Sequence, residues 1–192
     1  MIKVIPNVFT PKECNELIKY SEKIGYSDIL VNKFNESFKD SNFRNDFGVT
    51  VNDKDISKKL LAKVKNEVSE SGIKINPLLR FSKYEKDSRV IDHIDSILTK
   101  DKFKSKYTVI LYLNDAKGGE TEFEGIKINC VQGNLLIFDQ SLQHKGNKAK
   151  TVKYTLRTDI LVPDILVPKK VEKKVSGRLR KINIRRTDGR KD

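Results

Sequence analysis

The chain has 192 residues, of which 37% are hydrophobic, and its formal net charge at pH 7 is +13. This length and apolar content suffice for one hydrophobic core of ordinary size, and no run of residues approaches the apolar length of a membrane span. The opening residues 1–6 lack the long apolar stretch of a secretory signal, so we predict a cytoplasmic or nuclear protein without a transmembrane segment.

The first helix is predicted directly after Thr10. Thr10 and Glu13 have the spacing of a capping box, and Pro11 occupies the first helical position, where its missing N–H is harmless. A second helix is predicted from about residue 56 to 68. We expect the two helices to cover one side of a sheet. The second helix is indicated by apolar residues at helical spacing: Ile56, Leu60, Leu61, Val64 and Val68.

The two cysteines, Cys14 and Cys130, lie on a helical apolar stripe and in a predicted strand. Neither has the spacing of a metal site. We interpret both as small buried apolar residues in a reducing compartment, with a disulfide as the alternative.

From Pro77 onward the pattern changes to short apolar or alternating runs, separated by Gly, Asn and Asp. Such runs are typical of antiparallel strands in a sandwich or barrel. The polar, lysine-rich segment 96–106 is predicted to be a loop, either a lid or a solvated connection. The predicted strands are 78–84, 107–113, 126–131, 135–138 and 152–162.

The chain has only two histidines. His93 opens the triplet His93-Ile94-Asp95, and alternate side chains of an extended strand share a face, so His93 and Asp95 can bind one ion from the same side. His144 follows the strand-like run 134–138 and offers a second nitrogen. Two imidazoles and one carboxylate are the ligand set of non-haem Fe(II) oxygenases. The alternative is two ordinary surface or structural histidines.

A cation lies on the predicted strand that follows the second histidine. Lys153 comes nine residues after His144, and Lys153, Thr155 and Arg157 alternate on one face of the predicted strand. A dicarboxylate that chelates a metal with one end needs a buried positive partner and hydroxyl donors at its other end. The alternative is an amphipathic strand with a polar face.

Over most of its length the chain resembles the prolyl 4-hydroxylase-like family of Fe(II)/2-oxoglutarate dioxygenases. The resemblance rests on several short motifs in a fixed order around the two histidines. Besides His93-Ile94-Asp95 and His144 with Lys153-Tyr154, they are Ile5 to Cys14, Phe43-Arg44-Asn45-Asp46, Arg80 to Tyr84, Tyr107 to Asn114 and Gly118-Gly119-Glu120-Thr121.

The resemblance implies an α+β, mainly β fold: a double-stranded β-helix (jelly-roll) core with N-terminal helices packed on one sheet. It implies that Fe(II), 2-oxoglutarate and dioxygen are used, with ascorbate as a further candidate. The metal ligands and catalytic residues that it implies are His93, Asp95 and His144, and the implied 2-oxoglutarate contacts are Tyr84, Tyr112 and Lys153, with Thr155 as a neighbour.

For the activity, the resemblance implies hydroxylation of an unactivated C–H bond with release of succinate and CO₂. The leading hypothesis for the substrate is a prolyl residue of a protein or peptide. The second is a nucleic acid or a nucleic-acid-associated protein, because the net charge is high. A third hypothesis is a jelly-roll binding module without catalysis.

The composition shifts after the predicted domain 1–162. The segment 163–192 contains eleven Lys and Arg against four Asp and Glu, and it repeats residues 159–163 as 164–168. We predict a basic C-terminal tail in which 169–192 either contacts nucleic acid or forms a solvated extension. The abundance of Lys, Ile and Asn indicates an AT-rich source genome, such as that of a large DNA virus or a protist.

Overall fold

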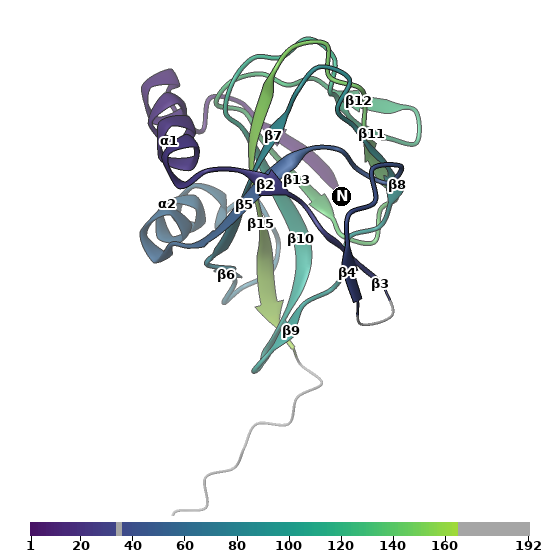
Figure 1. The fold of residues 1–192 in the computed structure, drawn as a ribbon. Coiled ribbons are helices and arrows are strands. Elements are labelled where there is room, and N and C mark those ends of the chain that lie inside the picture. The colour runs from purple at the N-terminus through teal and green to yellow at the C-terminus, as the bar shows by residue number, and fades with distance from the viewer. Residues whose placement is uncertain (34–35, 165–192) are drawn as a thin grey trace, which may run out of the picture.

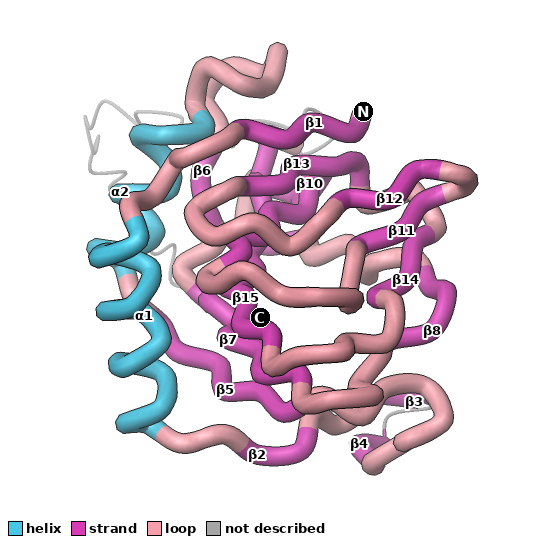
Figure 2. The backbone as a smooth tube through the Cα atoms, turned by 90° about the horizontal axis from the view of Figure 1, so that it is seen from above, coloured by secondary structure: helices cyan, strands magenta, loops and turns pink. Residues whose placement is uncertain are grey.

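The computed structural model describes residues 1–33 and 36–164. Within these residues, two helices and two larger antiparallel sheets form three layers, with the helices on the outside of the larger sheet and the smaller sheet on its other side (Figures 1 and 2). Two antiparallel sheets that face each other across a shared interior are the arrangement of a jelly roll. The interior between the sheets is where the candidate site lies.

The larger sheet has nine strands in the described residues, in the order β1-β13-β10-β15-β7-β5-β2, with β6 paired to β15 and β9 to β10. Its longest pairing joins β10 and β15, which run antiparallel over most of their length. The strands are β1 (Ile2–Ile5), β2 (Ser27–Asp28), β5 (Phe47–Asn52), β6 (Lys74–Ile75), β7 (Leu78–Tyr84), β9 (Thr99–Lys100), β10 (Phe103–Tyr112), β13 (Leu135–Asp139) and β15 (Lys153–Pro163).

The smaller sheet has four short strands in the order β12-β11-β14-β8. A separate hairpin, β3 (Val31–Lys33) and β4 (Glu36–Phe38), lies near its β8 end (Figure 2). The four strands of the smaller sheet are β8 (Val90–His93), β11 (Thr121–Phe123), β12 (Ile126–Ile128) and β14 (His144–Gly146).

Both predicted helices form, and both pack on the larger sheet. Helix α1 (Pro11–Ile24) begins with the predicted capping box, in which Thr10 and Glu13 exchange hydrogen bonds. Helix α2 is Lys54–Val64, so the predicted range 56–68 was wrong at both ends. The Asp53 side chain caps the helix two residues earlier than expected, and the chain leaves the helix after Val64 although Val68 still packs against the core.

The strand predictions are confirmed most closely where apolar residues alternate or form a continuous run. β7 has the predicted limits. β13 ends one residue later than predicted, β15 begins and ends one residue later, and β12 stops three residues early. The predicted loop 96–106 was wrong from residue 99 onward. Residues 99–104 form the β9–β10 hairpin around Asp101, whose φ of 55° suits a tight turn.

The apolar core is divided by the larger sheet into two parts. On the helix side, Leu135 and Ile137 of β13 pack with side chains of α1 and α2. On the other side, Leu136 and Phe138 pack toward the smaller sheet. Both faces of β13 are therefore covered, which explains its continuous apolar run. Both cysteines are buried and free, as expected: Cys14 lies in the first part and Cys130 in the second.

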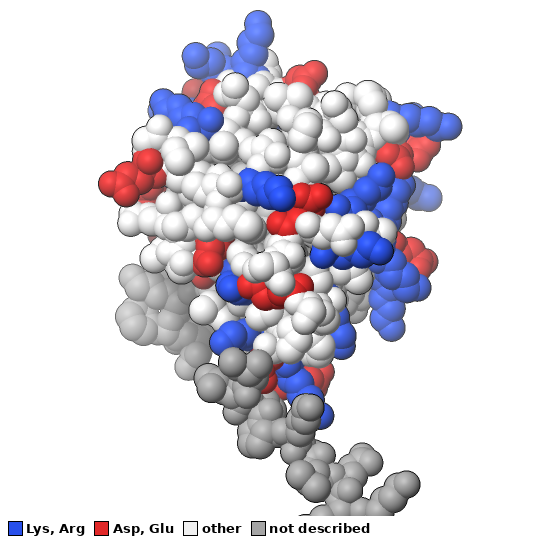
Figure 3. Space-filling model, turned by 180° about the vertical axis from the view of Figure 1, so that it is seen from behind, with Lys and Arg blue, Asp and Glu red and all other residues white. Residues whose placement is uncertain are grey.

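Figure 3 shows one face, on which Lys and Arg gather along one side with Asp and Glu interspersed. Neither helix of the described residues has the length and apolar character to cross a bilayer. Strand β15 ends at Pro163, and the backbone N–H of Asp164 donates to the carbonyl of Lys102. The remainder of the predicted basic tail, residues 165–192, lies outside the described residues.

Candidate metal centre and co-substrate pocket

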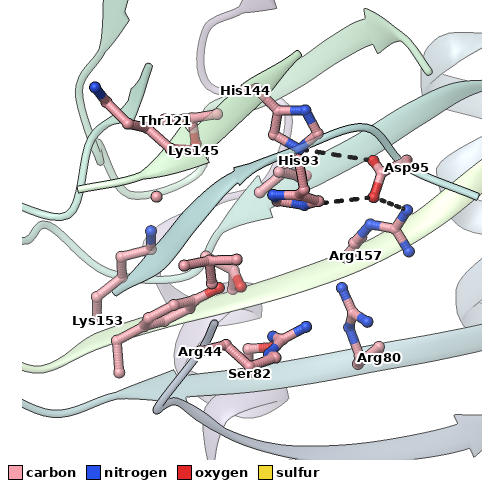
Figure 4. Close-up of a pocket in the computed structure, with 15 residues that line it drawn as sticks. Arg44, Arg80, Ser82, His93, Asp95, Thr121, His144, Lys145, Lys153 and Arg157 are labelled. Atoms are coloured by element: carbon pink, nitrogen blue, oxygen red, sulfur yellow. Dashed lines mark ion pairs between the residues drawn. The ribbon is translucent and has the colours of Figure 1, made fainter. Parts of the chain in front are cut away.

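A polar pocket opens between the two sheets and contains most of the predicted site residues (Figure 4). Strands β7 and β15 of the larger sheet form its floor, and β8 and β14 of the smaller sheet form one wall. Five lining residues are Lys or Arg, and Asp95 is the one acidic residue among those that line it. The lining residues are Arg44, Arg80, Ser82, Tyr84, Val90, His93, Asp95, Ile110, Thr121, His144, Lys145, Gly146, Lys153, Thr155 and Arg157.

The structure brings His93, Asp95 and His144 together. His93 ends β8, His144 begins β14, and the two residues are directly opposed in the antiparallel pairing of these strands. Their Nε2 atoms each lie 3.8 Å from an oxygen of Asp95. One potential ligand atom from each of the three residues lies within 4.8 Å of the other two. Asp95 follows the end of β8, but its side chain still reaches the same side as His93.

Both imidazoles are oriented by backbone carbonyls. The Nδ1 atom of His93 lies 2.8 Å from the carbonyl oxygen of Ile91, and Nδ1 of His144 lies 3.0 Å from that of Leu142. A carbonyl oxygen only accepts, so these contacts place the proton on Nδ1 and leave the lone pair on Nε2. Burial and the neighbouring His144 lower the pKa of His93, which favours the neutral form. Neutral imidazoles with free Nε2 atoms are the form that binds a metal.

The carboxylate of Asp95 is held from two sides. Thr108 donates from Oγ1 to Oδ2 at 2.6 Å, and the guanidinium of Arg157 lies 2.8 Å from Oδ1. Burial alone would raise the pKa of Asp95, but the charge of Arg157 and the hydrogen bond from Thr108 outweigh it and lower the pKa to about 2. Asp95 is therefore ionised at neutral pH and fixed in orientation.

Lys153 occupies the other end of the pocket floor. Its ammonium group is buried, donates to the carbonyl oxygen of Gly119 at 2.7 Å and lies 4.2 Å from the centre of the Tyr84 ring. Gly119 has a φ of 69°, and a Cβ at this position would lie 3.0 Å from Cδ of Lys153. The glycine therefore allows the close approach. Burial lowers the pKa of Lys153.

The other predicted co-substrate contacts lie at different depths. Thr155 lines the pocket between Lys153 and Arg157 on β15, and Tyr84 lines it on β7. Tyr112 is not among the lining residues. It is fully buried in the core between the sheets, and its hydroxyl lies 2.8 Å from Oγ1 of Thr121, which does line the pocket.

Sequence reasoning assigned no role to several residues in and around the pocket. Arg80 lies four residues before Tyr84 on β7 and faces the same side, so strand alternation was a usable signal. Thr108 and Arg157 contact Asp95 from β10 and β15, and no local pattern predicts that contact. Arg44 pairs with Asp46, its Nε and Nη2 lying 2.7 and 2.6 Å from the two carboxylate oxygens. Both residues fall in a motif of the family resemblance that had no assigned role.

The residues present fit Fe(II) and 2-oxoglutarate. Two imidazole nitrogens and one carboxylate form the ligand set of non-haem Fe(II) oxygenases, which leaves coordination positions open. Among the described residues, no carboxylate forms an ion pair with Lys153. A buried ammonium without an anionic partner suits the distal carboxylate of a dicarboxylate.

Comparisons with known proteins agree with this fit. Residues 79–158 match the family model of the 2OG-Fe(II) oxygenase superfamily. A viral collagen prolyl hydroxylase from Paramecium bursaria Chlorella virus-1, solved with 2-oxoglutarate, is 19% identical with a TM-score of 0.65; the match covers 84% of this chain and 96% of that one. No curated protein sequence matches.

Two further solved structures are similar over most of this chain. A Pseudomonas putida prolyl-4-hydroxylase is 13% identical, with a TM-score of 0.60 and coverage of 83% of this chain and 91% of that one. A Trichoplax adhaerens prolyl hydroxylase, in complex with a hypoxia inducible factor peptide fragment, is 17% identical, with a TM-score of 0.65 and coverage of 84% and 83%.

The superfamily match and the pocket together define the chain as a 2-oxoglutarate-dependent Fe(II) dioxygenase. Within that class it has the prolyl 4-hydroxylase-like jelly-roll fold, which confirms the predicted fold class. Its metal is Fe(II), and its co-substrate is 2-oxoglutarate.

Proposed function

We propose that this dioxygenase hydroxylates a prolyl residue of a protein or peptide, with Fe(II) held by His93, Asp95 and His144. The observation that carries the proposal is the convergence of three ligand atoms within 4.8 Å, in the same pocket as a buried lysine that has no carboxylate partner. The solved structures with the same fold include several prolyl hydroxylases, one of them bound to a peptide fragment.

The protein's own residues position the reactants. The ammonium group of Lys153 binds the distal carboxylate of 2-oxoglutarate, either in place of its hydrogen bond to the Gly119 carbonyl or in addition to it. Thr155 offers a neighbouring hydroxyl. Thr108 and Arg157 keep the Asp95 carboxylate oriented, and the backbone carbonyls keep both Nε2 atoms available. When bound, Fe(II) with dioxygen and 2-oxoglutarate supplies the oxidising power: one oxygen atom enters succinate, the other enters the C–H bond, and CO₂ is released.

The experiment that tests this function is a substrate panel. Fe(II)-loaded enzyme is incubated with 2-oxoglutarate and proline-containing peptides, and the products are scored by mass for the gain of one oxygen atom and by NMR for its position on the proline ring. Succinate release is measured in parallel. We expect hydroxylated proline in at least one peptide and none with His144→Ala, while the exposed neighbour variant Gln143→Ala stays active. Succinate release without any oxidised prolyl peptide across the panel contradicts the proposed substrate.

A second candidate substrate is a nucleic acid or a nucleic-acid-associated protein. It is favoured by the net charge of +13 and by the five cations that line the pocket. Methylated DNA and RNA oligonucleotides in the same panel test it. Loss of a methyl group from an oligonucleotide, with no oxidised peptide, favours this candidate over the first.

A further inference from the structure

The pairing of β7 with β15 places three cross-strand pairs on the pocket floor. Lys153 opposes Tyr84, Thr155 opposes Ser82, and Arg157 opposes Arg80. All six side chains line the pocket, as alternation along two paired strands requires. The floor therefore has a lysine at one end and two opposed arginines at the other. Figure 4 shows Arg80 and Arg157 on the side of Asp95, away from Lys153.

The opposed arginines are unfavourable without a ligand. Like charges directly opposite each other in an antiparallel pair repel. Arg157 is compensated, because it lies 2.8 Å from Asp95 and 3.5 Å from Asp159. Arg80 has no hydrogen-bond or ion-pair partner among the described residues, and its Nε is buried without an acceptor. A buried donor in this state is unusual in a folded protein and indicates that an acceptor comes from outside the chain.

The charge of the pocket points to an anion. Five lining residues are cationic; Asp95 neutralises Arg157, Asp46 neutralises Arg44, and Glu122 neutralises Lys145. The charges of Fe(II) and the 2-oxoglutarate dianion cancel each other, so two positive charges remain when both are bound. Burial and the charges of Arg157 and Arg44 lower the pKa of Arg80 to about 10, which still leaves it fully charged at neutral pH.

We propose that the substrate carries a carboxylate close to the carbon that is oxidised, and that this carboxylate binds between Arg80 and Arg157. The planar fork of a guanidinium binds a carboxylate through two parallel hydrogen bonds. The inference rests on the proposed function. It narrows the substrate to a proline beside an Asp or Glu residue, or to a proline whose own carboxylate is free. A carboxylate on a short side chain reaches a pocket floor between two sheets, whereas a duplex backbone does not.

The first test measures turnover with matched substrates. Peptides that contain Pro-Asp or Pro-Glu are compared with their Pro-Asn or Pro-Gln counterparts, and free proline with prolinamide. The enzyme variants are Arg80→Met, Arg80→Lys and the control Lys83→Met. Lys83 precedes Tyr84 on the opposite face of β7 and pairs with Glu22, so its loss removes the same charge outside the pocket. Thermal unfolding of each variant verifies that it is folded.

We expect wild-type kcat/KM to be about 10- to 100-fold higher for the carboxylate member of a matched pair, as loss of a hydrogen bond to a charged group predicts. Arg80→Met should abolish this preference, Arg80→Lys should retain part of it, and Lys83→Met should leave it unchanged. The matched pair that shows the preference identifies the carboxylate as that of a neighbouring Asp or Glu residue or as that of the proline itself. Equal kcat/KM for acid and amide in the wild type overturns the proposal.

The second test needs no turnover, so it separates this inference from the proposed function. In protein loaded with Zn(II) and 2-oxoglutarate, the Nε–H resonance of Arg80 is assigned by its loss in Arg80→Met. N-acetyl-aspartate amide should shift this resonance, and N-acetyl-asparagine amide should not. Three results overturn the proposal: no shift with either ligand, a shift of similar size on addition of 2-oxoglutarate alone, or a shift with a dinucleotide phosphodiester but not with the carboxylate.

Discussion

The two sheets contribute to the pocket in different ways. The larger sheet holds Lys153, Thr155 and Arg157 on an eleven-residue strand that is paired on both sides and backed by the helices. The smaller sheet holds His93 and His144 on strands of four and three residues with an irregular register between them. The proposed co-substrate contacts Lys153 and Thr155 thus lie on the sheet that has more packing support, and two of the candidate metal ligands lie on the sheet that has less. We expect a variant in the smaller sheet to lose metal binding, and a variant in the larger sheet to bind the co-substrate more weakly.

The largest effect on activity is expected for a variant in the smaller sheet. His144→Ala should abolish Fe(II)-dependent succinate release, because two protein ligands do not complete the facial set. The metal-free variant should unfold at nearly the same temperature as metal-free wild type, whereas only wild type should gain stability on metal addition. This gain is about 4 kcal/mol at a free metal concentration 1,000 times the Kd. Gln143→Ala serves as the control, and a fully active His144→Ala enzyme contradicts the assignment.

A variant in the larger sheet should weaken the co-substrate instead. Lys153→Ala removes the buried ammonium group, and loss of one partner of a buried charge pair costs about 2–5 kcal/mol of binding free energy. The KM for 2-oxoglutarate should therefore rise at least about 30-fold, while the Kd of the metal changes little. Kinetics at varied 2-oxoglutarate concentration measure the first quantity and anaerobic metal titration the second. Lys148→Ala, at an exposed position, is the matched control.

A smaller effect is expected where the larger sheet contacts the metal ligands. Thr108→Val removes the hydrogen bond to Oδ2 of Asp95, and loss of such a contact typically costs about 10- to 100-fold in metal affinity. We expect the low end of that range because Arg157 still holds the other oxygen. Metal titration measures the effect. The control is Thr158→Val, which removes a buried hydroxyl on β15 that donates to the carbonyl of Asn76. It should leave the metal Kd unchanged.

The smallest effect concerns the helix layer. Glu13→Gln should lower stability by about 0.5 kcal/mol at neutral pH, as expected for a partly exposed pair with Lys59 and a cap at Thr10. These contacts lower the pKa of Glu13 to about 2, so its contribution is present above its usual pKa of 4.5 and is lost as the pH falls toward 2. Thermal unfolding of both proteins from pH 7 to pH 2 should show the difference vanish, with turnover unaffected at pH 7.

The sequence predicted the parts of the fold and pocket that local pattern determines. The capping box at Thr10 and the alternation of Lys153, Thr155 and Arg157 depend on neighbours along the chain, and the structure has both. The hairpin around Asp101 was missed because its strands are polar and short. The opposition of Arg80 and Arg157 depends on the register between strands 77 residues apart, which the spacing within either strand does not determine.

The central claim is that His93, Asp95 and His144 bind a single metal ion on the side of the pocket formed by the smaller sheet. Its most direct test is a crystal structure of the protein grown anaerobically with Mn(II) in place of Fe(II) and with 2-oxoglutarate, with the metal located by anomalous scattering. We predict one anomalous peak, bound by Nε2 of both histidines and an oxygen of Asp95, with 2-oxoglutarate reaching toward Lys153. A peak bound elsewhere, or no peak between these three side chains at saturating metal, would contradict the account.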